Sequence, residues 1–145
     1  MAVAEALGKE GFEGIKLPVD KNGLVSLDEV KKNLNDKTVV VSVTMADSET
    51  GTLQPISEIA SLIRSFRGGR LLPYFHTDAS QAAAYADIKV EKLGVDLLTL
   101  SAHKLRGPKG IGGLYIRRGR QLEPIIYGGG QQGRLRSGTE NVPAI

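Results

Sequence analysis

Reactive side chains in this sequence gather at three points, each directly after a stretch of apolar or β-branched residues. The first group is Ala46–Gly51, the second is His76–Gln81 and the third is Ser101–Lys104. Ligands of open α/β sheets collect where the carboxyl ends of parallel strands meet. If the three stretches are parallel strands, the three groups share one edge, and this coincidence indicates a functional site more strongly than any single residue.

Lys104 is the candidate for covalent chemistry. A partly desolvated lysine at a strand end can act as an amine nucleophile and form an imine with a carbonyl cofactor. The loop Gly107–Gly110 that follows would hold the lysine backbone rigidly, and Ser101 and His103 could donate hydrogen bonds to a phosphate. Lysines are usually solvated, and a lone histidine such as His103 is more often structural.

Asp78 ends a second apolar stretch, where a carboxylate needs a cationic or hydrogen-bonding partner. One interpretation is an N-cap for the turn that follows. The other is a carboxylate that pairs with a protonated ring nitrogen, which is what pyridoxal phosphate requires in order to act as an electron sink. The residue pattern leaves both open.

Alternating strand and helix patterns predict the elements that position these groups. Strands are expected over residues 38–45, 71–77, 95–100 and 111–116, with the last returning beside the third as a hairpin; the first is apolar on both parities, as in a strand buried on both faces. Ahead of the first strand, Ser26 and Glu29 form a capping-box signature for a short helix. Between the first two strands, Pro55 opens a longer helix that Gly68 ends. Short helical turns are expected over 80–85 and 90–94, and a loop over 104–110. This pattern predicts an α/β fold with a mainly parallel sheet.

The composition is that of an ordinary globular protein, with 41% hydrophobic and 24% charged residues in 145. The net charge is +3, with basic clusters at Arg64–Arg70, Arg117–Arg120 and Arg134–Arg136. No aromatic residues interleave with them, so we interpret them as solvated surface and expect no nucleic-acid partner. The absence of cysteine excludes a disulfide framework and a thiolate metal site. Without a signal peptide or a bilayer-length apolar run, a cytoplasmic protein with no membrane partner is expected.

Three motifs, in order, resemble those of the class V aminotransferases, in particular the cysteine desulfurases. Ser101–Gly112 is similar to the family's lysine motif, His76–Gln81 to its pyridinium-binding strand end, and Gly128–Asn141 to its glycine-rich segment. The resemblance covers essentially the whole chain. It implies the three-layer α/β/α large domain of a transferase dependent on pyridoxal phosphate. Because both ends fall inside predicted helices, we expect residues 1–145 to be the central part of that domain, which would be incomplete.

The resemblance also implies residue roles. Lys104 would carry pyridoxal 5'-phosphate covalently and later move the proton at the substrate's α-carbon. Asp78 would pair with the pyridine nitrogen, and Gln81 would hydrogen-bond the ring's phenolic oxygen. Ser101 and His103 would bind the cofactor phosphate. In a further cofactor-binding role, Thr139 would bind the phosphate of the neighbouring subunit's cofactor, so a homodimer is implied.

The sequence departs from the family pattern in three respects. Ser48 stands where the family has an asparagine that touches the cofactor, and the shorter serine reaches the same oxygen only through a shifted backbone or a water. The family's ring-stacking histidine is expected upstream of these residues. Its nucleophilic cysteine and its carboxylate-binding arginine are expected beyond Ile145. With no cysteine of its own, the chain cannot form a persulfide and is expected to be inactive by itself.

The reaction that the resemblance implies converts L-cysteine to L-alanine. The sulfur passes through a cysteine persulfide to an acceptor or scaffold protein, for iron–sulfur cluster or thio-cofactor synthesis. The alternatives are another class V aminotransferase or lyase, such as selenocysteine lyase, and a non-catalytic remnant of the fold. The run Arg136–Asn141 favours the desulfurase branch, while the choice between sulfur and selenium stays open.

Overall fold

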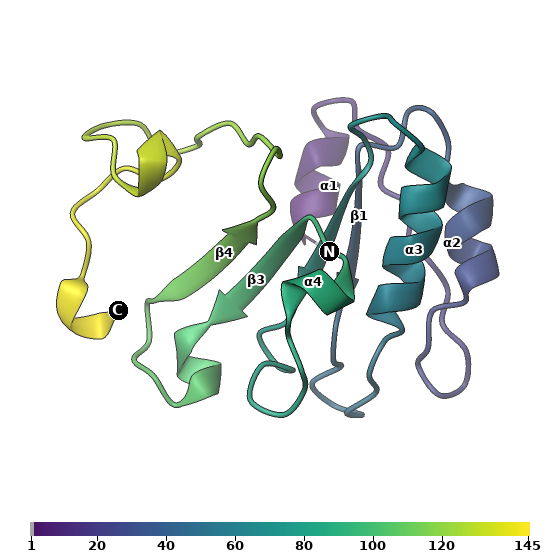
Figure 1. Ribbon diagram of the computed structural model, residues 1–145, viewed down its shortest axis with the longest axis horizontal. Helices are drawn as coiled ribbons and strands as arrows, with labels where there is room; N and C mark the ends of the chain where they lie inside the picture. The colour runs from purple at the N-terminus through teal and green to yellow at the C-terminus, as the bar shows by residue number, and fades with distance from the viewer. Residues whose placement is uncertain (1) are drawn as a thin grey trace.

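The computed structural model describes residues 2–145 and contains one four-stranded sheet with helices packed on it (Figure 1). The strands are β1 (Val40–Thr44), β2 (Tyr74–Asp78), β3 (Leu97–Ser101) and β4 (Gly112–Ile116). They lie side by side in chain order, with β1, β2 and β3 parallel and β4 antiparallel to β3. The α-helices are α1 (Ala2–Gly8), α2 (Leu27–Asn33), α3 (Ile56–Arg67) and α4 (Val90–Leu93). The α/β class, the mainly parallel sheet and the hairpin return of the fourth strand are therefore confirmed.

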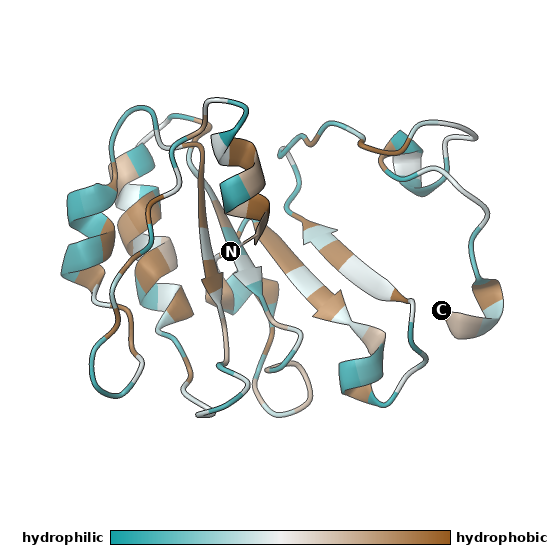
Figure 2. Cartoon of the chain, turned by 180° about the vertical axis from the view of Figure 1, so that it is seen from behind, coloured by the Kyte–Doolittle hydropathy of each residue, from teal (hydrophilic) through white to brown (hydrophobic). Residues whose placement is uncertain are grey.

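The core lies between one face of the sheet and α3. Ile59 and Ile63 of α3 are completely buried and belong to the same apolar cluster as Phe75 of β2 and Leu98 of β3. Each such side chain contributes about 1.5–3 kcal/mol through burial. Figure 2 shows hydrophobic residues concentrated in the strands and α3, while the connecting loops are mainly hydrophilic. This packing anchors β2 and β3 to α3.

The predicted helix boundaries agree closely with the structure. Ser26 caps α2 by accepting a hydrogen bond from the amide of Asp28 at 3.2 Å. Pro55 precedes α3, and Gly68 ends it with a φ of 57°, a left-handed value that favours glycine. Residues 79–86 form hydrogen-bonded turns, as expected.

Three local predictions were wrong. The first strand is not buried on both faces: Val43 packs into the core, but Val40, Ser42 and Thr44 are exposed, because only the face that carries Val43 packs against the apolar cluster. The second strand begins at Tyr74, because Leu71–Pro73 precede its pairing with β1. The loop expected from Lys104 is in part a 3₁₀ helix, η1 (Ala102–Leu105).

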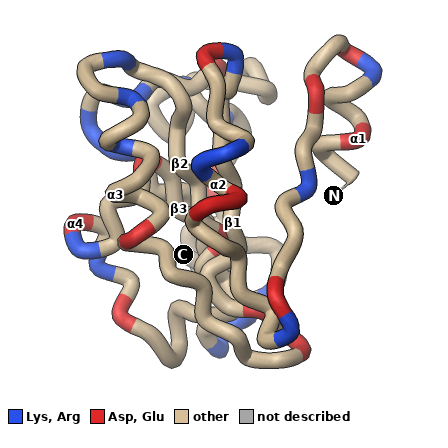
Figure 3. Tube along the Cα trace, turned by 90° about the vertical axis from the view of Figure 1, so that its right-hand side faces the viewer, with Lys and Arg blue, Asp and Glu red and all other residues tan. Residues whose placement is uncertain are grey.

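Two segments extend from this body. Helix α1 buries none of its residues and stands apart from the sheet in Figure 3. After β4 the chain forms an arm, residues 122–145, with two short 3₁₀ helices, η2 (Gln132–Arg134) and η3 (Val142–Ala144). The arm is closed on itself by pairing of Ile126 with Arg136. No helix in the described part of the chain has the length and apolarity that would let it span a membrane.

Candidate functional site

The three groups of polar residues meet at one edge of the sheet. Thr44 pairs with Asp78, Asp78 pairs with Thr99, and Ser101 pairs with Gly112. The amide of Met45 donates to the carbonyl of Asp78 at 2.8 Å, which ties the first two strand ends together. This edge is the lower one in Figure 1, where β3 runs into η1. The register therefore supports the expected convergence of the strand ends.

Asp78 is half-buried at the last position of β2. Its Oδ1 accepts a hydrogen bond from the amide of Ser80 at 2.9 Å, which is the capping role. No other side-chain hydrogen bond to this carboxylate is found within residues 2–145, so Oδ2 can still accept one. The two interpretations of Asp78 are therefore compatible, because each uses a different oxygen. Gln81 lies half-buried in the turns that follow.

Ser101 and His103 are in direct contact. Ser101 Oγ lies 2.9 Å from His103 Nδ1, and both precede Lys104, which is exposed within η1. The turn is tight: the amide of Gly107 donates to the carbonyl of Ala102 at 2.8 Å, and a Cβ at Gly107 would come within 3.0 Å of that oxygen. A side chain at Gly107 would therefore crowd this turn. The side chain of Lys104 is exposed beside it.

Ser48 and Thr139 lie apart from this group. Ser48 is exposed in a turn that Asp47 organises, since its Oδ1 accepts from the amides of Glu49 and Thr50 and from the Thr50 hydroxyl. These hydrogen bonds lower the pKa of Asp47, and the bond from the Thr50 amide has the largest effect. Thr139 is exposed on the arm, and every hydrogen bond found for residues 122–145 stays within the arm. The structure does not join Thr139 to the sheet edge of its own chain.

His76 is a polar site residue to which the sequence alone assigned no role. Its Nδ1 lies 2.7 Å from Ser42 Oγ and its Nε2 lies 2.8 Å from Thr99 Oγ1, so the imidazole joins three strands. Alternate residues of a strand share a face, which puts His76 beside Asp78. Burial lowers the pKa of His76, and the nearby Asp78 charge opposes this only in part. Ser42, His76 and Thr99 are polar residues within otherwise apolar strand sequences, and this pattern could have indicated a contact between them. The pattern becomes informative only when the strand register is known.

The whole chain, residues 1–145, matches the family model described as aminotransferase class-V. The chain is 48% identical over 136 residues to the cysteine desulfurase IscS of Methanosarcina thermophila. The match covers 94% of this chain and 32% of that relative. It is 44% identical over 144 residues to the mitochondrial cysteine desulfurase of Candida albicans, covering 98% of this chain and 28% of that protein. The chain thus spans about a third of the length of these curated relatives.

Solved structures give the same result. A NifS-like protein superposes with a TM-score of 0.90 at 40% identity, over 97% of this chain and 38% of that one. A structure described as SspA in complex with cysteine superposes with a TM-score of 0.89 at 36% identity, over 99% of this chain and 40% of that one. The fold is therefore that of part of a cysteine desulfurase-like α/β domain, and the chain belongs to the class-V aminotransferase family.

Proposed function

We propose that this chain forms the cofactor-binding edge of a cysteine desulfurase that depends on pyridoxal phosphate, as the central part of its large domain. The observation that carries the proposal is that parallel β2 and β3 end together, so that Asp78 and the turn Ser101–Lys104 share one edge. The similarity to cysteine desulfurases over nearly the whole chain supports it.

The residues at this edge suit the cofactor's chemical groups. Asp78 keeps one carboxylate oxygen for a protonated ring nitrogen, because only Oδ1 is engaged by Ser80. The Ser101 hydroxyl and the His103 imidazole are neighbours that can donate to a phosphate. Gln81 would contact the phenolic oxygen, and Ser48 would take the place of the family asparagine. Thr139 on the arm would reach the cofactor of a partner subunit in a homodimer.

Each residue would then have a defined task. When bound, pyridoxal phosphate supplies the electron sink for the substrate's α-carbon. Lys104 holds the cofactor and afterwards moves the proton at that α-carbon, for which its exposed position in a rigid turn is suited. The Asp78 carboxylate stabilises positive charge on the ring nitrogen. His76, fixed by Ser42 and Thr99, keeps the face beside Asp78 polar.

The substrate would be L-cysteine and the products L-alanine and a sulfur atom passed to a cysteine thiol. That thiol must come from outside these 145 residues, because the sequence contains no cysteine. An acceptor or scaffold protein would receive the sulfur for iron–sulfur cluster or thio-cofactor synthesis, in the cytoplasm.

Proton exchange at the α-carbon tests this proposal without requiring a protein thiol. L-cysteine in deuterated buffer is followed by proton NMR with the protein and pyridoxal phosphate, against cofactor alone. We expect exchange faster than the cofactor blank, reduced to the blank in Lys104→Ala and retained in Lys109→Ala, which removes a nearby exposed lysine. Equal exchange in both variants would refute the role of Lys104.

A further inference from the structure

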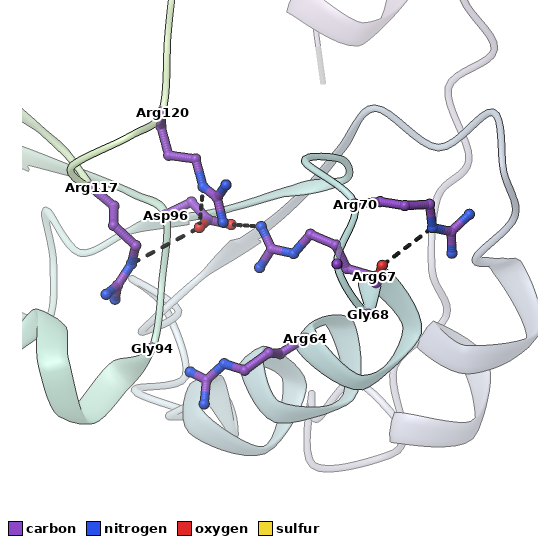
Figure 4. Close-up of a pocket in the computed structure, with 9 residues that line it drawn as sticks. Arg64, Arg67, Gly68, Arg70, Gly94, Asp96, Arg117 and Arg120 are labelled. Atoms are coloured by element: carbon purple, nitrogen blue, oxygen red, sulfur yellow. Dashed lines mark hydrogen bonds and ion pairs between the residues drawn. The ribbon is translucent and has the colours of Figure 1, made fainter.

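A second site lies at the opposite end of the strands from the proposed cofactor edge. It is a cleft of about 390 Å³ between three parts of the chain: the end of α3, the residues just before β3 and the segment after β4. Arginines from these elements line it together with one carboxylate and three glycines: Arg64, Arg67, Arg70, Arg117, Arg120, Asp96, Gly68, Gly69 and Gly94 (Figure 4). Figure 3 shows Lys and Arg gathered at this end of α3. The basic clusters that the sequence suggested to be solvated surface thus converge, in part, on one cleft.

The positive charge of the cleft is only partly compensated inside the protein. Asp96 accepts from Arg67 at 3.1 Å, from Arg120 at 2.8 Å and from the Phe75 amide at 2.9 Å, so its two oxygens are already engaged. Arg70 pairs with Asp36. Five arginines against these two carboxylates leave an excess of three positive charges around one cleft.

Several of the arginines are already held by backbone carbonyls. Arg117 donates to the carbonyls of Val95 at 2.8 Å and Val90 at 3.2 Å. Arg70 donates to the carbonyls of Phe66 and Arg67, which belong to the last turn of α3. Carbonyls at a helix end repel anions, so their engagement by Arg70 weakens this repulsion.

Arg64 differs from the others. Its side chain makes no ion pair or hydrogen bond within residues 2–145, although it lies in the last turns of α3. Its guanidinium extends toward Gly94, where a Cβ would come within 2.8 Å of Arg64 Nη2 (Figure 4). The backbone at position 94 has a φ of 72°, a left-handed value that glycine adopts more readily than other residues. The glycine leaves room for a guanidinium whose donors remain available to a ligand.

We propose that this cleft binds a phosphate-class oxyanion carrying two or more negative charges, with Arg64 and the outer nitrogens of Arg120 as its ligands. Guanidinium groups bind such anions through paired N–H donors of fixed geometry. The site is separate from the cofactor edge, and the inference does not rest on the proposed function.

Calorimetric titration with diphosphate and with inorganic phosphate, at constant ionic strength, tests the site in the full chain. Ionic strength is fixed because salt screens exposed charges. We expect saturable binding, with the diphosphate Kd raised about tenfold in Arg64→Gln, the loss expected for one charged hydrogen-bond donor. Arg118→Gln is the matched control, since Arg118 is exposed, adjacent to Arg117 and outside the cleft. Arg64→Gln should fold normally, because Arg64 is exposed and its side chain has no hydrogen-bond or ion-pair partner among residues 2–145. Circular dichroism checks this.

His103→Ala distinguishes this site from phosphate binding at the proposed cofactor edge. We expect diphosphate affinity to be unchanged in this variant. Absence of saturable binding in the parent protein would overturn the proposal. So would equal Kd values in Arg64→Gln and Arg118→Gln, or loss of binding in His103→Ala with Arg64→Gln unaffected.

Discussion

Asp96 is the centre of a buried ion cluster, and its replacement by asparagine should strongly destabilise the fold. The Asp96 side chain is 1% exposed and that of its partner Arg67 is 7% exposed. Asp96→Asn preserves the shape of the side chain but removes the charge that faces Arg67, Arg120 and, at 3.9 Å, Arg117. It also places an amide donor against arginine donors. Removing one partner of a buried pair costs about 3–5 kcal/mol, because the other charge stays buried.

A loss of this size is a large part of the total stability of a domain, which is about 5–15 kcal/mol. Urea unfolding followed by circular dichroism measures it. The matched control is Asp87→Asn, because Asp87 pairs with Lys92 at 2.8 Å on the surface, with side chains 48% and 68% exposed. Surface pairs contribute little. If both variants unfold at the same urea concentration, the Asp96 cluster does not stabilise the fold.

The cluster also predicts an acid dependence. Burial by itself raises the pKa of Asp96, but the Phe75 amide and the Arg120 and Arg67 guanidiniums outweigh it, so the pKa is lowered overall. An aspartate whose pKa is lower in the folded state contributes stability above its unfolded pKa, near 3.8, and this contribution is lost as the pH falls through the folded value. The parent protein should therefore lose stability below about pH 4 more steeply than Asp96→Asn. Parallel curves would contradict this.

Three further predictions follow from single contacts. Ile59→Ala removes a completely buried side chain of α3 and should lower the free energy of unfolding by about 2–5 kcal/mol in urea titration; a loss below 1 kcal/mol would contradict the core described above. Gly112→Ala should lower the melting temperature, because a Cβ at Gly112 would lie 2.8 Å from the carbonyl oxygen of Leu100. Gly113→Ala should change it little, because a Cβ at Gly113 meets nothing within 4 Å. Equal melting temperatures of the two variants would refute this steric explanation. His76 has a pKa lowered from 6.5, so the unfolded chain takes up its proton first and stability should fall as the pH drops below about 6.5. His76→Gln should flatten that part of the stability curve, and an unchanged slope would exclude the effect.

The sequence predicts the elements well where local signals are strong. Ser26 and Pro55 mark the starts of α2 and α3, and Gly68 marks the end of α3, through caps and dihedral preferences that act within a few residues. The convergence of Asp78 and Ser101–Lys104 follows from a general rule about parallel strands, and the register bears it out.

Features that depend on distant contacts could not be predicted. The Ser42–His76–Thr99 chain of hydrogen bonds requires the register of three strands. The pairing of Arg67 with Asp96 joins residues 29 positions apart, and neither lies in a motif. The exposure of one face of β1 depends on which elements cover it, which the apolar pattern of the strand itself does not show.

Lys104 is proposed as the lysine that holds the cofactor. Borohydride reduction of the protein with pyridoxal phosphate, followed by peptide mass analysis, tests it most directly. We expect a phosphopyridoxyl group on Lys104, with Lys109 and the other exposed lysines unlabelled and the label lost in Lys104→Ala. Labelling spread equally over surface lysines, and unchanged in Lys104→Ala, would contradict it.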